Sequence, residues 1–516
     1  MSLPEGKESL KPAEVIAAAQ MVAPPRSPKI LDFLAGLPAI IAVFGLLGLL
    51  GLALLNPPTA ANYAAESKRR LEKDDAPGAM VCARRVATMR PGDAENRYQM
   101  ITLLLKTGDI QRADAIAQEM VDLDDRQYDQ AAKEEGGFGL AQAHLYLAER
   151  YASDVRNIPR TWPKIEQHLK KYMRVARATG RTKEALQAEG MLGEVYAQAD
   201  ILKEAREILE KTSADNPMRL FKLGVVCDKL RDHDIAVRHF KAAVQSAKAA
   251  IGENPENRPA RVAWALSTAS LRDFAGALKI LNDGYELSRE EEYRRMMASI
   301  CLDWARILRL EPGPNGDTHL AERIKHVEDG LKLDPTNLEL LTELGAMMDL
   351  PAKEAEEAKK IFNRLIASSQ SAGTCHFFLG NDAWKRDKID VARTHWEEAF
   401  KLEPKMPIVA NNLAFLLAFK EPVDEKRAIS IVDQALNVQG STPALQGQLL
   451  GTRGQILAKM GKWKEALTSL EASLRSEQKS PGIHAALAET YEHLDMKDLA
   501  EEHKRIAEEL AKAKVR

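Results

Sequence analysis

The chain has 516 residues, of which 45% are hydrophobic and 29% charged, and 73 basic against 75 acidic residues give a formal net charge of −2. This balance excludes a global basic field for nucleic acid, and the composition excludes collagen-like, disulfide-rich and fully membrane-embedded proteins. Aromatic residues make up only 5%, so alanine and leucine carry the apolar content, which favours helices over sheets.

An uncharged apolar run of 23 residues extends from Phe33 to Leu55. As a helix it would reach roughly 34 Å, enough for a hydrocarbon core of about 30 Å. The sequence therefore predicts a transmembrane helix within residues 29–57, after a flexible tail over residues 1–28. A cleaved signal peptide is the alternative, because Thr59-Ala60-Ala61 offers a cleavage site.

Charges beside the apolar run bear on its orientation. Arg26 and Lys29 flank it closely on the N-terminal side, whereas the basic residues of 68–73 lie farther away and are mixed with acids. The basic residues close to the run favour a cytoplasmic N-terminus, whereas the basic residues farther beyond the run favour the opposite orientation. We predict a single-pass protein of the cell membrane with its large domain outside the cytoplasm.

The remainder of the chain repeats a pattern with a period near 34 residues. In the unit that begins at Gly373, Gly380 and Ala392 are small, Trp396 is bulky and Pro404 ends the unit. Small residues let two helices approach, the bulky residue fills the gap between them, and the proline stops the second helix. This pattern resembles the tetratricopeptide repeat, which implies an all-α solenoid of helix pairs.

The same frame recurs from residue 60 to residue 516. Units begin at residues 60, 94, 186, 217, 258, 338, 373, 407, 447 and 481, and degenerate helix pairs occupy residues 136–180 and 291–335. These make about twelve pairs, as a more degenerate array over residues 60–335 and a regular array over residues 336–516. The final helix, about Asp498–Lys514, is dense in Glu and Lys and is expected to cap the stack.

Motifs of catalysis or metal binding are absent from the sequence. HExxH, GxSxG and a GxGxxG after a strand do not occur, and the nearest approach to a phosphate loop, residues 454–462, has the wrong glycine spacing. The eleven histidines are dispersed. The four cysteines are expected to be small buried hydrophobic residues: Cys82, Cys227, Cys301 and Cys375. We therefore predict a non-enzymatic protein with no cofactor and no metal.

The resemblance also implies a binding surface, because fixed positions of the first helix of each unit line the concave face in tetratricopeptide arrays. Transferring that frame gives Phe377, Asn381, Trp384, Asn411, Phe415 and Phe419, with Asn412 at a further matching position. Aromatic side chains offer large contact area, and amides can bond a peptide backbone. The alternatives are packing between units, or a groove filled by a segment of the chain itself.

The function that these features favour is a membrane-anchored scaffold that binds a protein or peptide partner and assists a membrane or envelope complex. The chain resembles membrane-anchored tetratricopeptide proteins of bacteria. The alternative is a secreted or anchored solenoid that is accessory to an enzyme or to polysaccharide processing. Self-association is a further option, since Gly45, Gly48 and Gly51 could form a contact face in the apolar run.

Overall fold

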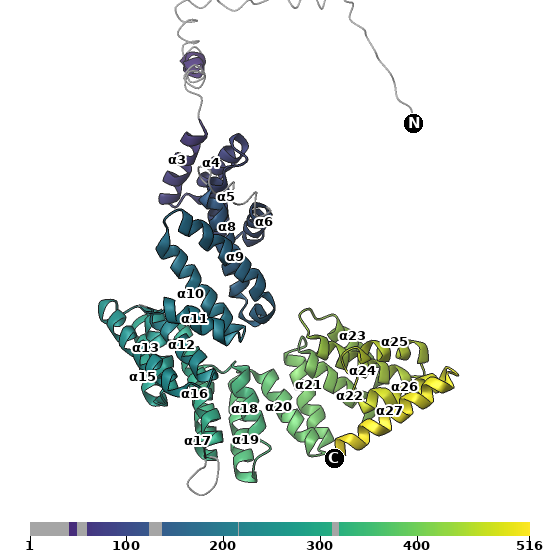
Figure 1. Ribbon diagram of the computed structural model, residues 1–516. Helices are drawn as coiled ribbons and strands as arrows, with labels where there is room; N and C mark the ends of the chain where they lie inside the picture. The colour runs from purple at the N-terminus through teal and green to yellow at the C-terminus, as the bar shows by residue number, and fades with distance from the viewer. Residues whose placement is uncertain (1–40, 49–58, 123–136, 215, 312–318, 516) are drawn as a thin grey trace, which may run out of the picture. The chain divides into compact units, whose positions relative to one another are not determined.

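The computed structural model of the protein describes residues 41–48, 59–122, 137–214, 216–311 and 319–515 (Figure 1). All regular elements in these residues are helices, which confirms the predicted all-α class. None of these helices is both long and apolar enough to span a membrane. Residues 41–48 are helical and exposed, while the rest of the predicted span from Phe33 to Leu55, and the tail over residues 1–28, lie outside the described residues.

The chain divides into two compact units, Met1–Ile208 and Leu209–Arg516. The described helices of the first unit are α3 (Ala60–Glu72), α4 (Ala76–Met89), α5 (Ala94–Lys106), α6 (Ile110–Val121), α8 (Phe138–Ser153), α9 (Ile158–Ala178) and α10 (Thr182–Gln198). Helix α11 (Leu202–Thr212) contains the division between the units. Helices α3 and α4, α5 and α6, and α8 and α9 pack on each other as consecutive pairs.

The second unit continues the same alternation. Its helices are α12 (Pro217–Lys229), α13 (His233–Glu253), α14 (Arg258–Ser270), α15 (Phe274–Ser288), α16 (Glu291–Leu310), α17 (Leu320–Leu333), α18 (Leu338–Met347), α19 (Ala352–Ala367), α20 (Ala372–Lys385), α21 (Ile389–Leu402), α22 (Pro407–Phe419), α23 (Glu425–Leu436), α24 (Pro443–Lys459), α25 (Trp463–Leu474), α26 (Pro481–His493) and α27 (Lys497–Val515). We call the first helix of each pair its A helix and the second its B helix. Each A helix also contacts the next A helix in the series α18–α20 and α22–α24–α26, so that neighbouring pairs stack.

The described residues thus contain the twelve predicted helix pairs, from α3–α4 to α26–α27. The two degenerate pairs over residues 136–180 and 291–335 correspond to α8–α9 and α16–α17. The predicted boundary between residues 335 and 336, which separates degenerate from regular repeats, stays a prediction.

Helix starts follow from local sequence. The Asn216 side chain accepts hydrogen bonds from the backbone N–H groups of the first turn of α12, and Asp273 does the same for α15. Proline is the first residue of α22, α24 and α26, where its missing N–H costs no hydrogen bond: Pro407, Pro443 and Pro481. Side-chain caps and prolines thereby fix where these five helices begin.

The fit of a small residue against a large one is confirmed within three helix pairs. A Cβ on the glycine of the A helix would lie 2.5 Å from a ring or branch carbon of the B helix in the pairs Gly224–Phe240, Gly380–Trp396 and Gly454–Leu470. Such a distance is far inside van der Waals contact, so only glycine leaves room for the large side chain. In all three pairs the glycine and the large residue are separated by the same number of residues in the sequence.

The unit that begins at Leu338 departs from this arrangement. A Cβ on Gly345 would lie 2.6 Å from Cδ1 of Phe378, which belongs to the next unit. Phe378 in turn stacks on Phe362, with ring centroids 5.7 Å apart. Phe362 on α19 is therefore joined to Gly345 through a ring from the following A helix.

The cysteines and the glycine-rich segment have structural roles. All four cysteines are free and buried, as predicted, and burial raises the pKa of the Cys301 and Cys375 thiols to about 12. Within residues 454–462, Gly454 accommodates Leu470, and Gly461 takes a φ of 73° in the turn between α24 and α25. The spacing of these glycines is thus explained by packing and by a turn.

Candidate functional site

The structure places the seven predicted binding residues on two neighbouring A helices. Helix α20 carries Phe377, Asn381 and Trp384, and α22 carries Asn411, Asn412, Phe415 and Phe419. All seven are half-buried, so each is held by neighbours and retains some exposed surface. We call the surface formed by Phe377, Trp384, Phe415 and Phe419 the aromatic face.

Three rings of the aromatic face contact one another in series. Trp384 lies 6.2 Å from Phe415, edge-on at 85°, and Phe415 lies 4.9 Å from Phe419, measured between ring centroids. Phe377, Trp384 and Phe419 also pack against the buried core around Trp396 and Leu413. Rings held in this way lose little side-chain entropy when a partner covers them, which is typical of aromatic anchors in protein interfaces.

The asparagines connect repeat units. Asn381 Oδ1 accepts hydrogen bonds from Trp396 Nε1 and from Asn412 Nδ2, each at 3.2 Å. Asn411 Oδ1 accepts from Thr452 Oγ1 at 2.8 Å. These bonds join α20 to α21 and α22, and α22 to α24. The two carbonyl oxygens thus serve packing between units, in keeping with the alternative weighed for these residues, while binding by all seven residues stays a prediction.

Two lysines that the sequence did not single out border the aromatic face. Lys420 Nζ lies 5.6 Å from the ring centroid of Trp384, and Lys459 Nζ lies 5.4 Å from that of Phe419. Lys459 also donates to the carbonyl of Ala418 and lies 3.4 Å from a carboxylate oxygen of Glu425. Both lysines sit at the C-terminal end of an A helix, where a cation is favoured by the helix dipole. That terminal position is the signal in the sequence that could have indicated them.

The histidines are less dispersed in space than in sequence. Six of them form pairs between the A and B helices of one unit, with Nδ1 atoms 2.7–2.9 Å apart: His144–His168, His376–His395 and His484–His503. The last two pairs occupy the same two positions of their units. In the part of the chain that the structure describes, no three His, Cys, Asp or Glu side chains converge as a metal site would require. Each pair is a hydrogen bond that needs one protonated and one unprotonated Nδ1.

Stability is expected to fall with acidity because of these pairs. Burial, helped by Lys171 and Lys164, lowers the pKa of His168 from 6.5 to about 4, and burial also lowers the pKa of His376 and of His395. A lowered pKa means that the unfolded chain takes up protons first, so stability is full above pH 6.5 and declines as the pH falls toward 4.

Urea denaturation of the protein and of His168→Gln between pH 4 and 8 measures this dependence. The variant should lose less stability than the native chain over the acidic part of the range. Equal losses would contradict the role assigned to His168.

The comparisons with known proteins concern the fold. No protein-family model and no curated protein matches the sequence. The chain is similar to the solved structure of the APC/C hetero-tetramer Cut9–Hcn1, with 13% identity over 89% of this chain and 95% of that chain and a TM-score of 0.32. It is similar to the structure of yeast Tom70, with 15% identity over 87% of this chain and 92% of that chain and a TM-score of 0.29. It is also similar to MamA of MSR-1, with 18% identity over 34% of this chain and 95% of that one and a TM-score of 0.27.

These likenesses are distant and add no residue-level argument. The fold rests on the twelve described helix pairs and on the glycine-to-large-residue contacts inside them. The chain is an all-helical repeat protein of tetratricopeptide-like type.

Proposed function

We propose that the protein is a non-enzymatic, membrane-anchored scaffold that binds a protein or peptide on the aromatic face of α20 and α22. The observation that carries the proposal is the row of contacting, half-exposed rings of Trp384, Phe415 and Phe419. Half-exposed aromatic side chains in fixed positions are the residues on which protein interfaces most often depend. The partner that fits is a segment with apolar anchor side chains.

The anchor in this proposal is the apolar run from Phe33 to Leu55, whose length suits one helical crossing of a bilayer. Arg26 and Lys29 beside it favour a cytoplasmic N-terminus and an array outside the cytoplasm. An array held at the membrane surface meets membrane and envelope partners at a raised local concentration, which suits a role in assisting such a complex.

One experiment with two successive measurements tests both the membrane anchor and the binding of a partner at the aromatic face. Membranes that contain the full tagged chain are washed with alkaline carbonate, then solubilised in detergent and used for a pull-down. Retention after the wash supports the anchor, and release contradicts it. The pull-down compares the native chain with Trp384→Ala plus Phe415→Ala, for which we expect recovery of the partner to fall at least about tenfold, as for two hot-spot residues.

The matched control replaces two half-buried aromatic side chains on B helices, in the double variant Tyr285→Ala plus Trp463→Ala. It removes a similar amount of aromatic surface away from the aromatic face, so partner recovery should stay near that of the native chain. Equal recovery with both double variants would refute binding at the aromatic face.

A further inference from the structure

A hydrogen bond between two histidines joins the helices of the repeat that carries half of the aromatic face. His376 on α20 and His395 on α21 approach each other with their Nδ1 atoms 2.9 Å apart, and both side chains are half-buried. His376 directly precedes Phe377 of the aromatic face. His395 directly precedes Trp396, whose Nε1 group donates to Asn381 on α20. The histidine pair thus lies where α21 holds α20, and with it the aromatic face, in position.

The bond in this pair survives one added proton and fails with two. In the neutral pair one Nδ1 carries a hydrogen and donates it to the lone pair of the other. A first proton can be taken up at the unprotonated Nε2 of the donor ring, which keeps the bond and makes it charge-assisted. A second proton must go to the acceptor Nδ1, so that two N–H groups and two positive charges face each other across 2.9 Å. Acid therefore replaces an attraction between α20 and α21 with a repulsion.

Burial makes protonation of the folded pair unfavourable. It lowers the pKa of His376 below 6.5, and Glu398 on α21, itself paired with Lys401 at 3.3 Å, opposes this only in part. Burial, and then the neighbouring His376, lower the pKa of His395. The unfolded chain therefore takes up these protons more readily than the folded chain does. The stability that the pair contributes is full above pH 6.5 and is lost as the pH falls below it.

The helices packed against α20 and α21 offer the pair little compensating charge. Helix α22, which contacts α21, contains no charged residue. On α20 the buried Asp382 is already paired with Lys359 of α19 at 3.2 Å and with Arg386 at 2.8 Å. Glu403, which follows α21, accepts a hydrogen bond from the backbone N–H of Thr374 at 3.1 Å. The two acids of α18 pair with arginines of α16 and α17.

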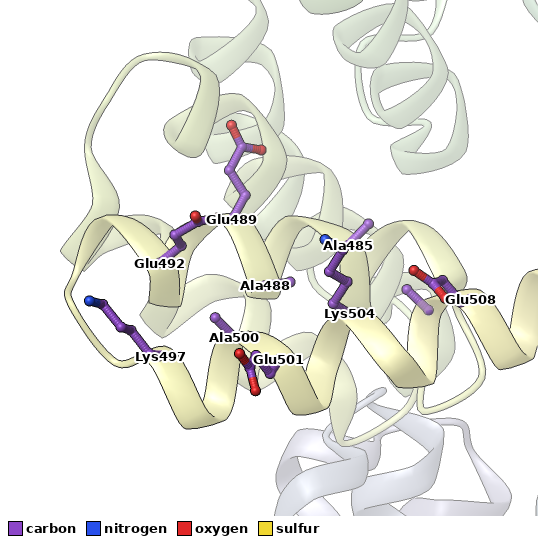
Figure 2. A pocket seen from close by; sticks show the side chains of 10 residues that line it. Ala485, Ala488, Glu489, Glu492, Lys497, Ala500, Glu501, Lys504 and Glu508 are labelled. Atoms are coloured by element: carbon purple, nitrogen blue, oxygen red, sulfur yellow. The ribbon is translucent and has the colours of Figure 1, made fainter.

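The corresponding pair of the last unit, His484–His503, lies in a more acidic setting. Burial, and then His484, lower the pKa of His503, while Glu502 and Glu471 act against this. A cleft of about 530 Å³ is open between α26 and α27, and four carboxylates and two ammonium groups line it: Glu489, Glu492, Glu501, Glu508, Lys497 and Lys504 (Figure 2). Positive charge added between α26 and α27 therefore meets more carboxylates than it does between α20 and α21.

We propose that acid separates α20 from α21 at the His376–His395 pair and thereby releases the partner from the aromatic face. Helix α20 carries Trp384, whose ring lies 6.2 Å from that of Phe415 on α22. When α20 is no longer held by α21, this contact and the continuous row of rings are lost. The release of a partner rests on the proposed function, whereas the separation of the two helices does not.

Hydrogen–deuterium exchange of the full chain in detergent, at pH 7.5 and pH 4.5 and corrected for intrinsic rates, measures the separation without a partner. We expect the amides of α20 and α21 to lose at least about tenfold in protection at pH 4.5. Helices α24 and α25, which have Leu450 and Ser469 at the corresponding positions, should keep theirs. The variant His376→Asn plus His395→Asn retains amide donors and acceptors but does not titrate, so its α20 and α21 should stay protected. Unchanged protection in the native chain, or equal losses in the native chain and the variant, would overturn the proposal.

Photo-crosslinking from position 415 measures the release. Membranes that contain the full chain with a photoreactive phenylalanine analogue in place of Phe415 are illuminated at pH 7.5 and pH 4.5. We expect the yield of adduct to fall at least about fivefold at pH 4.5, and less than about twofold in the His376→Asn plus His395→Asn variant. The matched control, His484→Asn plus His503→Asn, should respond like the native chain. An adduct that persists at pH 4.5, or that falls equally in all versions, overturns release by this pair, whereas no adduct even at pH 7.5 counts against the proposed function itself.

Discussion

Replacing Trp396 with alanine is expected to lower the free energy of unfolding by about 3–5 kcal/mol, the usual cost of removing a buried tryptophan from a core. The side chain is 3% exposed and packs in the core between α20, α21 and α22. Its Nε1 group also donates to Asn381, so the substitution removes a hydrogen bond together with the packing. Urea denaturation followed by circular dichroism gives the change.

Substitution of Gly380 tests whether the stability lost in Trp396→Ala comes from the specific fit between glycine and tryptophan or only from the burial of a large side chain. In the native chain Gly380→Ala should destabilise, because its Cβ would lie 2.5 Å from Trp396 Cδ1 and overpacking costs about 1–3 kcal/mol. In the Trp396→Ala background the space is empty, so the same substitution should stabilise by up to about 1 kcal/mol through helix propensity. Additive effects of the two substitutions would contradict the fit between glycine and tryptophan.

Glu343→Ala is expected to lower the free energy of unfolding by about 3–5 kcal/mol, because it removes one partner of a buried ion pair. Glu343 on α18 and Arg323 on α17 are 7% and 5% exposed, and their side chains lie 3.2 Å apart. Arg309, half-exposed, approaches the same carboxylate at 3.6 Å. Loss of the carboxylate leaves the Arg323 guanidinium charged within the packed interior, and thermal or urea denaturation measures the cost.

Two controls separate this effect from a general loss of surface charge. Glu339→Ala removes a carboxylate 3.0 Å from Arg306 that is 68% exposed, and exposed pairs contribute at most about 1 kcal/mol. Arg323→Met plus Glu343→Leu removes both buried charges and should be much closer to the native chain than Glu343→Ala. A cost for Glu343→Ala no greater than that for Glu339→Ala would refute the buried ion pair.

The helix pairs could be predicted from the sequence because their determinants are local. Gly380 and Trp396 lie within one unit, and the contact between them depends only on two helices joined by a short turn. The contact between Gly345 and Phe378 could not be predicted in the same way, because it joins consecutive units and depends on how they stack. The histidine pairs lie within single units, as Gly380 and Trp396 do, but they were missed because the repeat frame assigns no residue type to their two positions.

The sequence could predict which residues of the candidate site lie close together, but it could not predict the hydrogen bonds that they make. The repeat frame selects Trp384 and Phe415, which lie in contact on adjacent A helices. It does not reveal that the Asn381 carbonyl is engaged by Trp396 and Asn412, since hydrogen-bond partners depend on side-chain rotamers. Lys420 and Lys459 escape the frame because they follow the positions that it assigns to the binding surface.

Site-specific photo-crosslinking in the cell that makes the protein tests binding at the aromatic face most directly. A photoreactive phenylalanine analogue replaces Phe415 in one version of the full chain and Thr468, an exposed residue of α25, in another. Illumination should join a partner protein to the chain with the analogue at position 415 and not to the chain with it at position 468. The absence of an adduct at position 415, or the same adducts at both positions, would contradict the account.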